Sequence, residues 1–260
     1  MGKQRIKIQY FWKVFLIIPI VLLFNVNILL TEGGIDSSVG AIMANALFEY
    51  AQIGDMKAYV FVIEGMYFIF VFNMLFGTYI YQDFQVSSIY LFSRLRDRRK
   101  WFYKKVIEIG TFSLIYTFLF LTTLFVICIF GSNQQLDVSS IHMMGMLLIF
   151  ISLFLTATTL LINLLTIKYN SSIGFICVYL VLLLLITVLL QSDWIALFTK
   201  TPYLLLLNPV AGVILNLAED RTMGVLATIY YLILNGIIIC GGAKFVNRLE
   251  IGLLEKDRDG

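Results

Sequence analysis

The side chains that most often carry catalysis are scarce in this chain. His142 is the only histidine among 260 residues, so no HExxH motif, His–carboxylate metal pair or Ser-His-Asp triad can form. The chain also has no phosphate-binding loop of the form GxxxxGKS or GxxxxGKT. Its three cysteines, Cys128, Cys177 and Cys240, lie inside apolar segments, where a single cysteine usually serves as a small hydrophobic side chain. We therefore expect no enzymatic activity, and no cofactor or metal ion bound by this chain itself.

Polar side chains inside long apolar segments are the remaining candidates for chemistry. Glu64 is an acid well inside such a segment, and a charge in a membrane usually faces a cavity, a partner or water because its burial is costly. Asn73, Asn163 and Asn235 are placed similarly, and amides there commonly hydrogen-bond between helices. Two interpretations stay open for these four residues: contacts between helices, or the lining of a substrate path.

A basic block, SRLRDRRKWFYKK, separates two apolar segments. Its last two residues, Lys104 and Lys105, lie one turn before Glu108 and predict a local ion pair. The block fits two interpretations: a topology signal with aromatic anchors at the membrane surface, or a docking site for a soluble protein. Apolar residues ahead of the charges predict a short amphipathic helix that leads into a basic turn; they are Phe84, Val86, Ile89, Tyr90 and Phe92.

The elements that must position these residues are membrane helices. Apolar residues form 60% of the chain, charged residues 13%, and the mean hydropathy is +0.91, which a soluble domain could not bury. The apolar runs are continuous and not alternating, which favours helices over a β-barrel. We predict an all-α integral membrane protein with one membrane domain over residues 1–260. Its six predicted spans are about 11–30, 58–80, 107–130, 143–167, 173–190 and 225–243.

The basic residues predict the orientation. All 19 Lys and Arg residues except Lys57, Lys200 and Arg221 fall on the side that holds both predicted termini. The positive-inside rule places that side, and therefore both termini, in the cytoplasm. We expect a multi-pass protein of the plasma membrane. The opposite face carries more acidic than basic residues, which is compatible with ordinary solubility or with attraction of a cationic ligand.

Two connections on the predicted outer side are more than turns. Residues 31–57 contain apolar positions at helical spacing and predict an amphipathic helix on the membrane surface. Residues 191–224 contain the segment LLLLNPVAGVILN, in which Asn208-Pro209 is typical of a helix start, with Asn as the cap and Pro at the first position. We expect one or two short outer helices before the last span.

This organisation resembles the ABC-2 type transporter permeases, on the basis of the SRLRDRRKWFYKK and LLLLNPVAGVILN segments. The compact size is similar to small Gram-positive permeases that act in export of, or immunity to, lantibiotics, phenol-soluble modulins and other amphipathic peptides. The resemblance implies a half-transporter, paired with a second permease copy or a paralogue above separate ATPase subunits that bind ATP and Mg. It also implies a coupling helix at about Asp83–Phe92 and a weaker contact at Lys168–Ser172. The implied ATPase-coupling residues are Asp83, Phe84, Ile89, Tyr90, Arg94, Arg96, Arg98 and Lys168.

The leading hypothesis is therefore a permease subunit of an ATP-driven exporter for an amphipathic or antimicrobial peptide or a lipid-like substrate. The alternative is a non-transporting immunity or sensor protein that binds a cationic peptide at the acidic outer face. An integral-membrane enzyme finds no support in paired catalytic groups. The expected partners are the ATPase, another permease and the lipid bilayer, with no nucleic acid. Co-purification with an ATPase separates the first two hypotheses.

Overall fold

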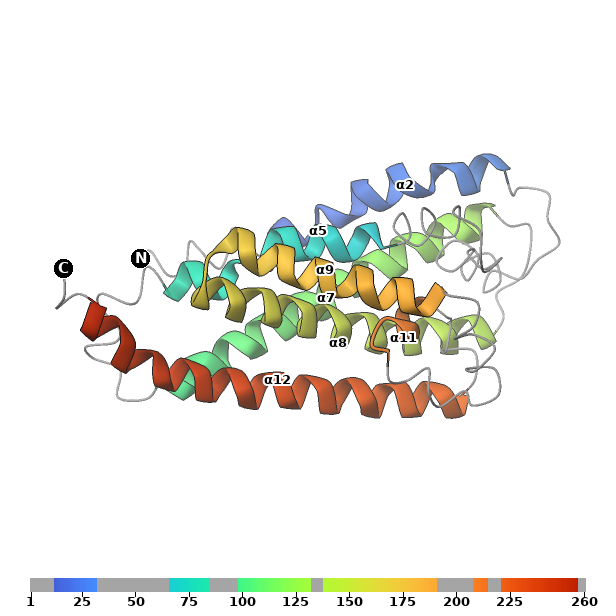
Figure 1. Cartoon of the computed structure of the whole chain (residues 1–260). Helices are drawn as coiled ribbons and strands as arrows, with labels where there is room; N and C mark the ends of the chain where they lie inside the picture. Colours follow the sequence, from blue (N-terminus) through green and yellow to red (C-terminus); the bar gives the residue numbers. More distant parts are fainter. Residues whose placement is uncertain are drawn as a thin grey trace.

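The described part of the chain is helical. The computed structural model describes residues 12–31, 66–84, 98–131, 138–190, 208–214 and 221–256, and no strand occurs among them. The helices are α2 (Ile17–Thr31), α5 (Tyr67–Phe76), α7 (Arg98–Gly131), α8 (Val138–Lys168), α9 (Ser171–Leu190), α11 (Ala211–Ile214) and α12 (Arg221–Lys256). The all-α prediction is confirmed for these residues (Figure 1).

Four helices are long and apolar enough to cross a membrane. They are the stretches Arg98–Phe130 of α7, Ser140–Lys168 of α8, Ser171–Leu189 of α9 and Thr222–Arg248 of α12. A shorter apolar helix covers Trp12–Phe24 within the first predicted span. The second predicted span, 58–80, is described only from residue 66 onward. These helices support a membrane protein, and the count of six spans stays a prediction.

Helix boundaries differ from the sequence prediction at the charged ends. The third span was predicted to begin at 107 after a basic turn, but α7 begins at Arg98, so the described basic residues belong to the helix. Lysine and arginine are good helix formers, and hydropathy detects only the apolar part of such a helix. With 34 residues, α7 is about 50 Å long, which exceeds the roughly 30 Å hydrocarbon layer. The last helix likewise continues beyond 243 to Lys256.

The bundle is arranged around α8. This helix packs against α7, α9, α12, α5 and α11, while α2 lies at the edge on α7 and α5 (Figure 1). Of its apolar window, 67% is buried, against 28–44% for the other three long helices, so α8 is the central one. A short turn joins α8 to α9, where Asn170 Oδ1 accepts a hydrogen bond of 2.8 Å from Ile173 N and caps α9.

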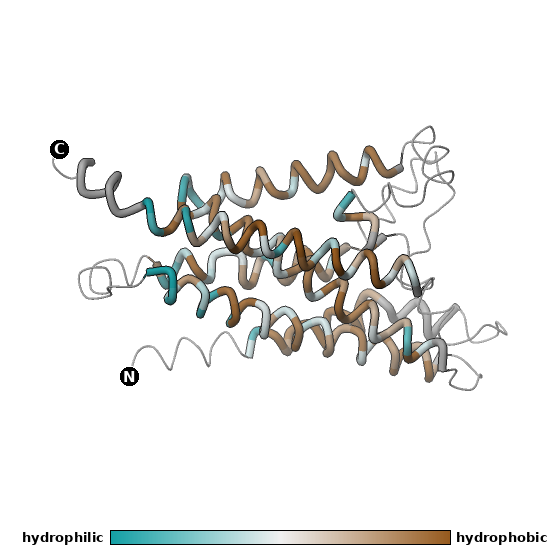
Figure 2. Tube along the Cα trace, turned by 90° about the horizontal axis from the view of Figure 1, so that it is seen from below, coloured by the Kyte–Doolittle hydropathy of each residue, from teal (hydrophilic) through white to brown (hydrophobic). Residues whose placement is uncertain are grey.

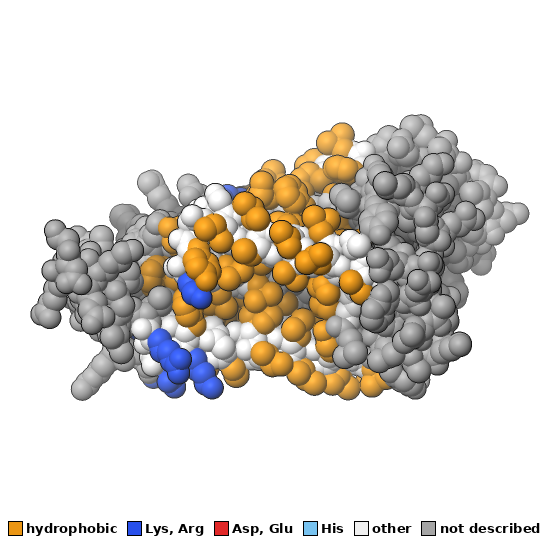
Figure 3. Space-filling view, viewed as in Figure 1, with side chains coloured by type: hydrophobic (Ala, Val, Ile, Leu, Met, Phe, Trp, Pro, Cys, Tyr) orange, Lys and Arg blue, Asp and Glu red, His pale blue; other side chains and the backbone are white. Residues whose placement is uncertain are grey.

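The outward surface of the bundle is apolar along its middle. Large side chains on α9 and α12 are exposed, among them Leu183, Leu184, Leu232 and Ile237. Figure 3 shows such side chains spread over the middle of one face. Hydrophobic residues follow the helices through the centre, and hydrophilic ones gather toward the ends (Figure 2). Exposed apolar side chains on long apolar helices are typical of a surface that faces lipid.

Basic residues gather at one end of the bundle. The described exposed ones lie near the start of α7, the end of α8 and the later part of α12, which share one end in Figure 1. Figure 3 shows Lys and Arg side chains only toward this end of the face that it draws. We call this the basic end. Its exposed members are Arg99, Lys100, Lys104, Lys168, Lys244 and Arg248.

Candidate functional site

The second predicted span contains a helix break near the basic end. Helix α5 ends at Phe76, residues 77 and 78 form a turn, and helix resumes over residues 79–84, which we call the 79–84 helix. Gly77 allows the close packing at this turn. An added Cβ there would lie 2.6 Å from Phe175 Cζ on α9 and 3.1 Å from Ile162 Cγ2 on α8. Because Gly77 has no side chain, the break can pack closely against both α8 and α9.

Asn163 of α8 fills the gap in the hydrogen-bond ladder at this break. Its Oδ1 accepts from Ile80 N at 2.7 Å and from Tyr81 N at 3.3 Å. Its Nδ2 donates to Phe76 O at 3.1 Å and to Thr159 O of α8 at 2.8 Å. In an uninterrupted helix Ile80 N would donate to Phe76 O directly. The amide of Asn163 therefore bridges two main-chain groups that an unbroken helix would join.

A second amide ties α5 to α8 one turn before the break. Asn73 is fully buried, and its Oδ1 accepts from Thr159 Oγ1 at 2.7 Å and from Thr158 Oγ1 at 3.3 Å. Thr159 thus contacts Asn73 through its hydroxyl and Asn163 through its carbonyl. These bonds satisfy the side-chain oxygen of Asn73, which lipid could not do.

Three of the predicted substrate-path residues, Asn73, Asn163 and Asn235, therefore form hydrogen bonds between helices in this structure. Asn235 of α12 donates to Leu153 O of α8 at 3.0 Å and to Tyr231 O at 2.9 Å. The structure brings Asn73 and Asn163 together at the α5–α8 contact and places Asn235 at the α8–α12 contact. Glu64 lies outside the described residues. A role for these residues in a substrate path stays a prediction.

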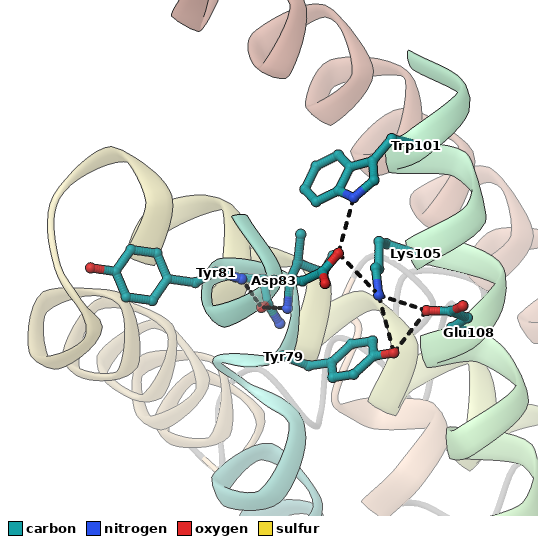
Figure 4. A network of polar contacts seen from close by, with 8 residues as sticks. Tyr79, Tyr81, Asp83, Trp101, Lys105 and Glu108 are labelled. Atoms are coloured by element: carbon teal, nitrogen blue, oxygen red, sulfur yellow. Dashed lines mark hydrogen bonds and ion pairs between the residues drawn. The ribbon is translucent and has the colours of Figure 1, made fainter. Parts of the chain in front are cut away.

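A buried charge cluster holds the far end of the 79–84 helix on α7. Lys105 Nζ lies 3.2 Å from Asp83 Oδ2 and 2.9 Å from Glu108 Oε2. The Tyr79 hydroxyl donates to Glu108 Oε2 at 2.7 Å and accepts from Lys105 Nζ at 3.2 Å. Trp101 Nε1 donates to Asp83 Oδ2 at 3.0 Å. Figure 4 shows Lys105 between the two carboxylates.

Burial makes this cluster energetically sensitive. The side chains of Lys105, Asp83 and Glu108 are only 9%, 10% and 13% exposed. Charges removed from water stay ionised at tolerable cost only when they are paired and hydrogen-bonded. The Lys105 ammonium also lies 4.5 Å from the centre of the Tyr79 ring, which adds a cation–π contact. The cluster therefore fixes the position of the 79–84 helix relative to α7.

Sequence reasoning found only part of this cluster. The predicted ion pair between Lys105 and Glu108 is confirmed. The roles of Asp83, Tyr79 and Trp101 were missed. A signal for them existed in the spacing: Tyr79 and Asp83 are four residues apart, as are Trp101 and Lys105, so each pair shares one helix face.

The predicted coupling residues that the structure describes lie near the basic end. The Asp83 carboxylate accepts a hydrogen bond from Trp101 and forms an ion pair with Lys105. The centres of the Phe84 and Trp101 rings lie 6.3 Å apart. Arg98 begins α7, and Lys168 ends α8 with its ammonium 4.9 Å from the Tyr169 ring centre. Ile89, Tyr90, Arg94 and Arg96 lie outside the described residues. Contact of any of these residues with an ATPase stays a prediction.

A short helix follows Asn208-Pro209, as predicted, but α11 begins at Ala211 and Pro209 lies in the turn before it and not at the first helical position. Asn208 Oδ1 accepts from Val210 N at 3.0 Å and caps the turn that leads into α11. Its Nδ2 donates to Leu185 O of α9 at 2.8 Å, and the Tyr231 hydroxyl of α12 donates to Pro209 O at 2.6 Å. These bonds tie the turn before α11 to α9 and α12, while α11 itself packs on α8.

An apolar pocket of about 300 Å³ opens between α2, α5 and α9. At one edge the rings of Phe24 and Tyr67 stack with their centres 4.3 Å apart. The volume is at the lower end of the range for small-molecule sites. The described residues that line the pocket are Phe24, Met66, Tyr67, Ile69, Phe70, Tyr179, Leu182, Leu183 and Ile186.

The site was also compared with metal-binding arrangements and with known proteins. Within the described ranges, no group of His, Cys, Asp or Glu residues is placed to hold a metal ion. No family model, no curated protein and no solved structure matches this chain.

Proposed function

We propose that this chain is a permease subunit of an ATP-driven ABC-2 type exporter. The observation that supports this proposal is the attachment of the 79–84 helix, which lies ahead of the basic block in the chain. Asn163 joins its beginning to α8, and Lys105 joins its end to α7. A force applied to the connection after residue 84 would therefore act on two long helices at once. Such an attachment would let the 79–84 helix transmit a rigid-body motion to the bundle.

The proposed orientation places the basic end in the cytoplasm. The support is the collection of exposed Lys and Arg residues there, which the positive-inside rule assigns to the cytoplasmic side. Both termini are then cytoplasmic, and the chain is a multi-pass protein of the plasma membrane with six spans. The basic end faces the soluble ATPase in this arrangement.

In the proposed complex, the partner ATPase binds ATP and Mg, and this chain contributes the membrane part. Tyr90 would anchor the ATPase contact, with Arg94, Arg96 and Arg98 at its rim, because aromatic and arginine residues dominate such interfaces. Asp83 would contribute indirectly, by holding the 79–84 helix on α7, since its carboxylate is bonded to Trp101 and Lys105. A second permease, identical or paralogous, would complete the path.

The proposed substrate is amphipathic, either a peptide or a lipid-like molecule. The pocket between α2, α5 and α9 supports this because its lining is apolar and could accept the apolar part of such a molecule. A non-transporting immunity or sensor protein for cationic peptides remains the second candidate, favoured only by the acidic composition of the predicted outer connections.

Affinity purification of the full chain from its own host in mild detergent tests this proposal. We expect a soluble ATPase to co-purify, and we expect Tyr90→Ala to abolish its recovery while membrane insertion is retained. Arg94→Ala combined with Arg98→Ala should weaken recovery in a salt-sensitive way, because rim charges are screened. Recovery of a correctly inserted chain without any ATPase would favour the second candidate, and full recovery with Tyr90→Ala would reject the proposed anchor.

A further inference from the structure

The hydrogen bonds at the helix break can be satisfied in two ways. In the structure, Ile80 N and Phe76 O both bond to the Asn163 amide, at 2.7 and 3.1 Å. These two groups are also the natural i→i−4 pair of a continuous helix. The regular ladder resumes immediately after the break, because Gln82 N donates to Thr78 O at 2.8 Å. Withdrawal of one side chain would therefore let the two helical pieces join.

Several features of the break are compatible with two arrangements, one with the helix broken by Asn163 and one with a continuous helix. Side chains inserted into the i→i−4 ladder are a recognised cause of helix kinks. Gly77 has φ −61° and ψ −19°, values within the right-handed helical region, so the turn residue itself is compatible with a continuous helix. Asn163 is fully buried and bonds across the α5–α8 contact, so it acts from a fixed position on the central helix.

We propose that Asn163 is a positioning residue that holds the 79–84 helix in a kinked state, and that its withdrawal lets α5 and the 79–84 helix join into one continuous helix. The direction of the 79–84 helix, and of the connection that it leads into, then depends on whether the Asn163 amide is inserted. The two-state break itself does not depend on the proposed function; its use in coupling to an ATPase rests on that function.

The charge cluster is the second constraint on this motion. Lys105 holds Asp83 at 3.2 Å, and Trp101 holds the same carboxylate oxygen at 3.0 Å. The 79–84 helix is therefore fixed by α8 at its start, and by α7 through Tyr79 at its start and Asp83 near its end. Reorientation at the break must shift the 79–84 helix against α7, whereas residues before Gly77 can stay in place.

Distances between spin labels on the full chain in detergent test the proposal directly. One pair joins Gln82→Cys, beyond the break, to Asn247→Cys on α12, and the reference pair joins Met74→Cys, before the break, to the same α12 position. All of these positions are exposed. Cys128, Cys177 and Cys240 are replaced by serine in every sample. No ATPase is needed, so failure of this test and failure of the proposed function can be told apart.

We expect Asn163→Leu to move the Gln82 pair and leave the Met74 pair unchanged. A reorientation of about 20° at the break would displace the end of a helix about 9 Å long by about 3 Å. Asn235→Leu is the matched control, because it removes a buried amide that also bonds α8 but lies away from the break. Asn163→Gln keeps an amide that can accept from Ile80 N and donate to Phe76 O, so it should move the distance back toward the original value even if Asn163→Leu folds poorly.

Unchanged Gln82 distances in a folded Asn163→Leu protein would overturn the proposal. Equal shifts in both label pairs, or the same shift in Asn235→Leu, would also overturn it, because they would indicate general loosening of the bundle. If the distance shift occurs but ATPase coupling survives, the two-state break stands and its use in coupling is rejected.

Discussion

At the scale of single residues, Lys105 links two carboxylates that come from different segments of the chain. Its ammonium contacts both Asp83 and Glu108, and it contacts the ring and the hydroxyl of Tyr79 as well. The carboxylates outnumber the ammonium, so the cluster depends on the lysine more than on either acid. Loss of the lysine would leave two buried carboxylates close together.

Lys105→Met should therefore destabilise the protein by about 3 kcal/mol, because breaking a buried pair leaves an uncompensated charge. Lys104→Met is the matched control, since Lys104 is the adjacent residue on the same helix and is exposed; its effect should stay within about 0.5 kcal/mol. Asp83→Asn should cost less than Lys105→Met, because Lys105 keeps Glu108. Denaturant unfolding in detergent micelles measures all three. Equal effects at positions 104 and 105 would show that the cluster adds no stability.

Gly77 offers a second residue-level prediction, based on shape. Gly77→Ala would place a Cβ against the main-chain oxygen of Asn73 and 2.6 Å from Phe175 Cζ, so overpacking should destabilise the protein by about 1–3 kcal/mol. Gly236 of α12 has no atom within 4 Å of an added Cβ, and Gly236→Ala should be neutral or stabilising by about 0.5–1 kcal/mol. Phe175→Ala combined with Gly77→Ala should relieve part of the loss. Melting temperatures of these variants test the contact, and equal losses at both glycines would contradict it.

At the scale of elements, the sequence predicted those features of the helices that are determined by residues close together in the chain. The apolar cores of α7, α8, α9 and α12 were found from hydropathy, and the Lys105–Glu108 pair was found from a spacing of three residues. The helix start at Asn208-Pro209 was found from its capping pattern. In each case the residues that decide the feature are neighbours in the chain.

The missed features depend on residues far apart in the sequence. The break after Phe76 is bridged by Asn163, which lies 83 residues from Ile80. The bonds of Asp83 to Trp101 and Lys105 join two segments, and spacing within each segment shows which residues share a helix face but not that the two faces meet. The early start of α7 at Arg98 was missed for another reason, because hydropathy does not report charged helical turns.

The pocket between α2, α5 and α9 gives an element-level prediction. Leu183 lines it, whereas its neighbour Leu184 is similarly exposed but lies outside the lining, at 51% and 58% exposure. If the pocket accepts the apolar part of the proposed substrate, Leu183→Trp should reduce export or binding several-fold by filling it, and Leu184→Trp should not. Equal activity of the two variants would remove the pocket from the proposed path.

At the scale of the whole molecule, the distribution of charge and apolar surface relates the bundle to its surroundings. The long helices present apolar side chains around the middle, and the exposed basic residues extend beyond them at one end (Figure 3). α12 shows this arrangement within one element. Its exposed residues Thr222 and Asn247 are about 37 Å apart at 1.5 Å per residue, which exceeds the roughly 30 Å hydrocarbon layer.

These two positions therefore test the orientation within a single helix. In a protein whose three cysteines are replaced by serine, Thr222→Cys should react with a membrane-impermeant maleimide in intact cells. Asn247→Cys should react only after the cells are opened, because the basic residues around it, Lys244 and Arg248, favour the cytoplasmic side. Labelling of both positions from outside would show that α12 does not span the membrane. The reverse pattern would place the basic end outside the cell and remove it from contact with a cytoplasmic ATPase.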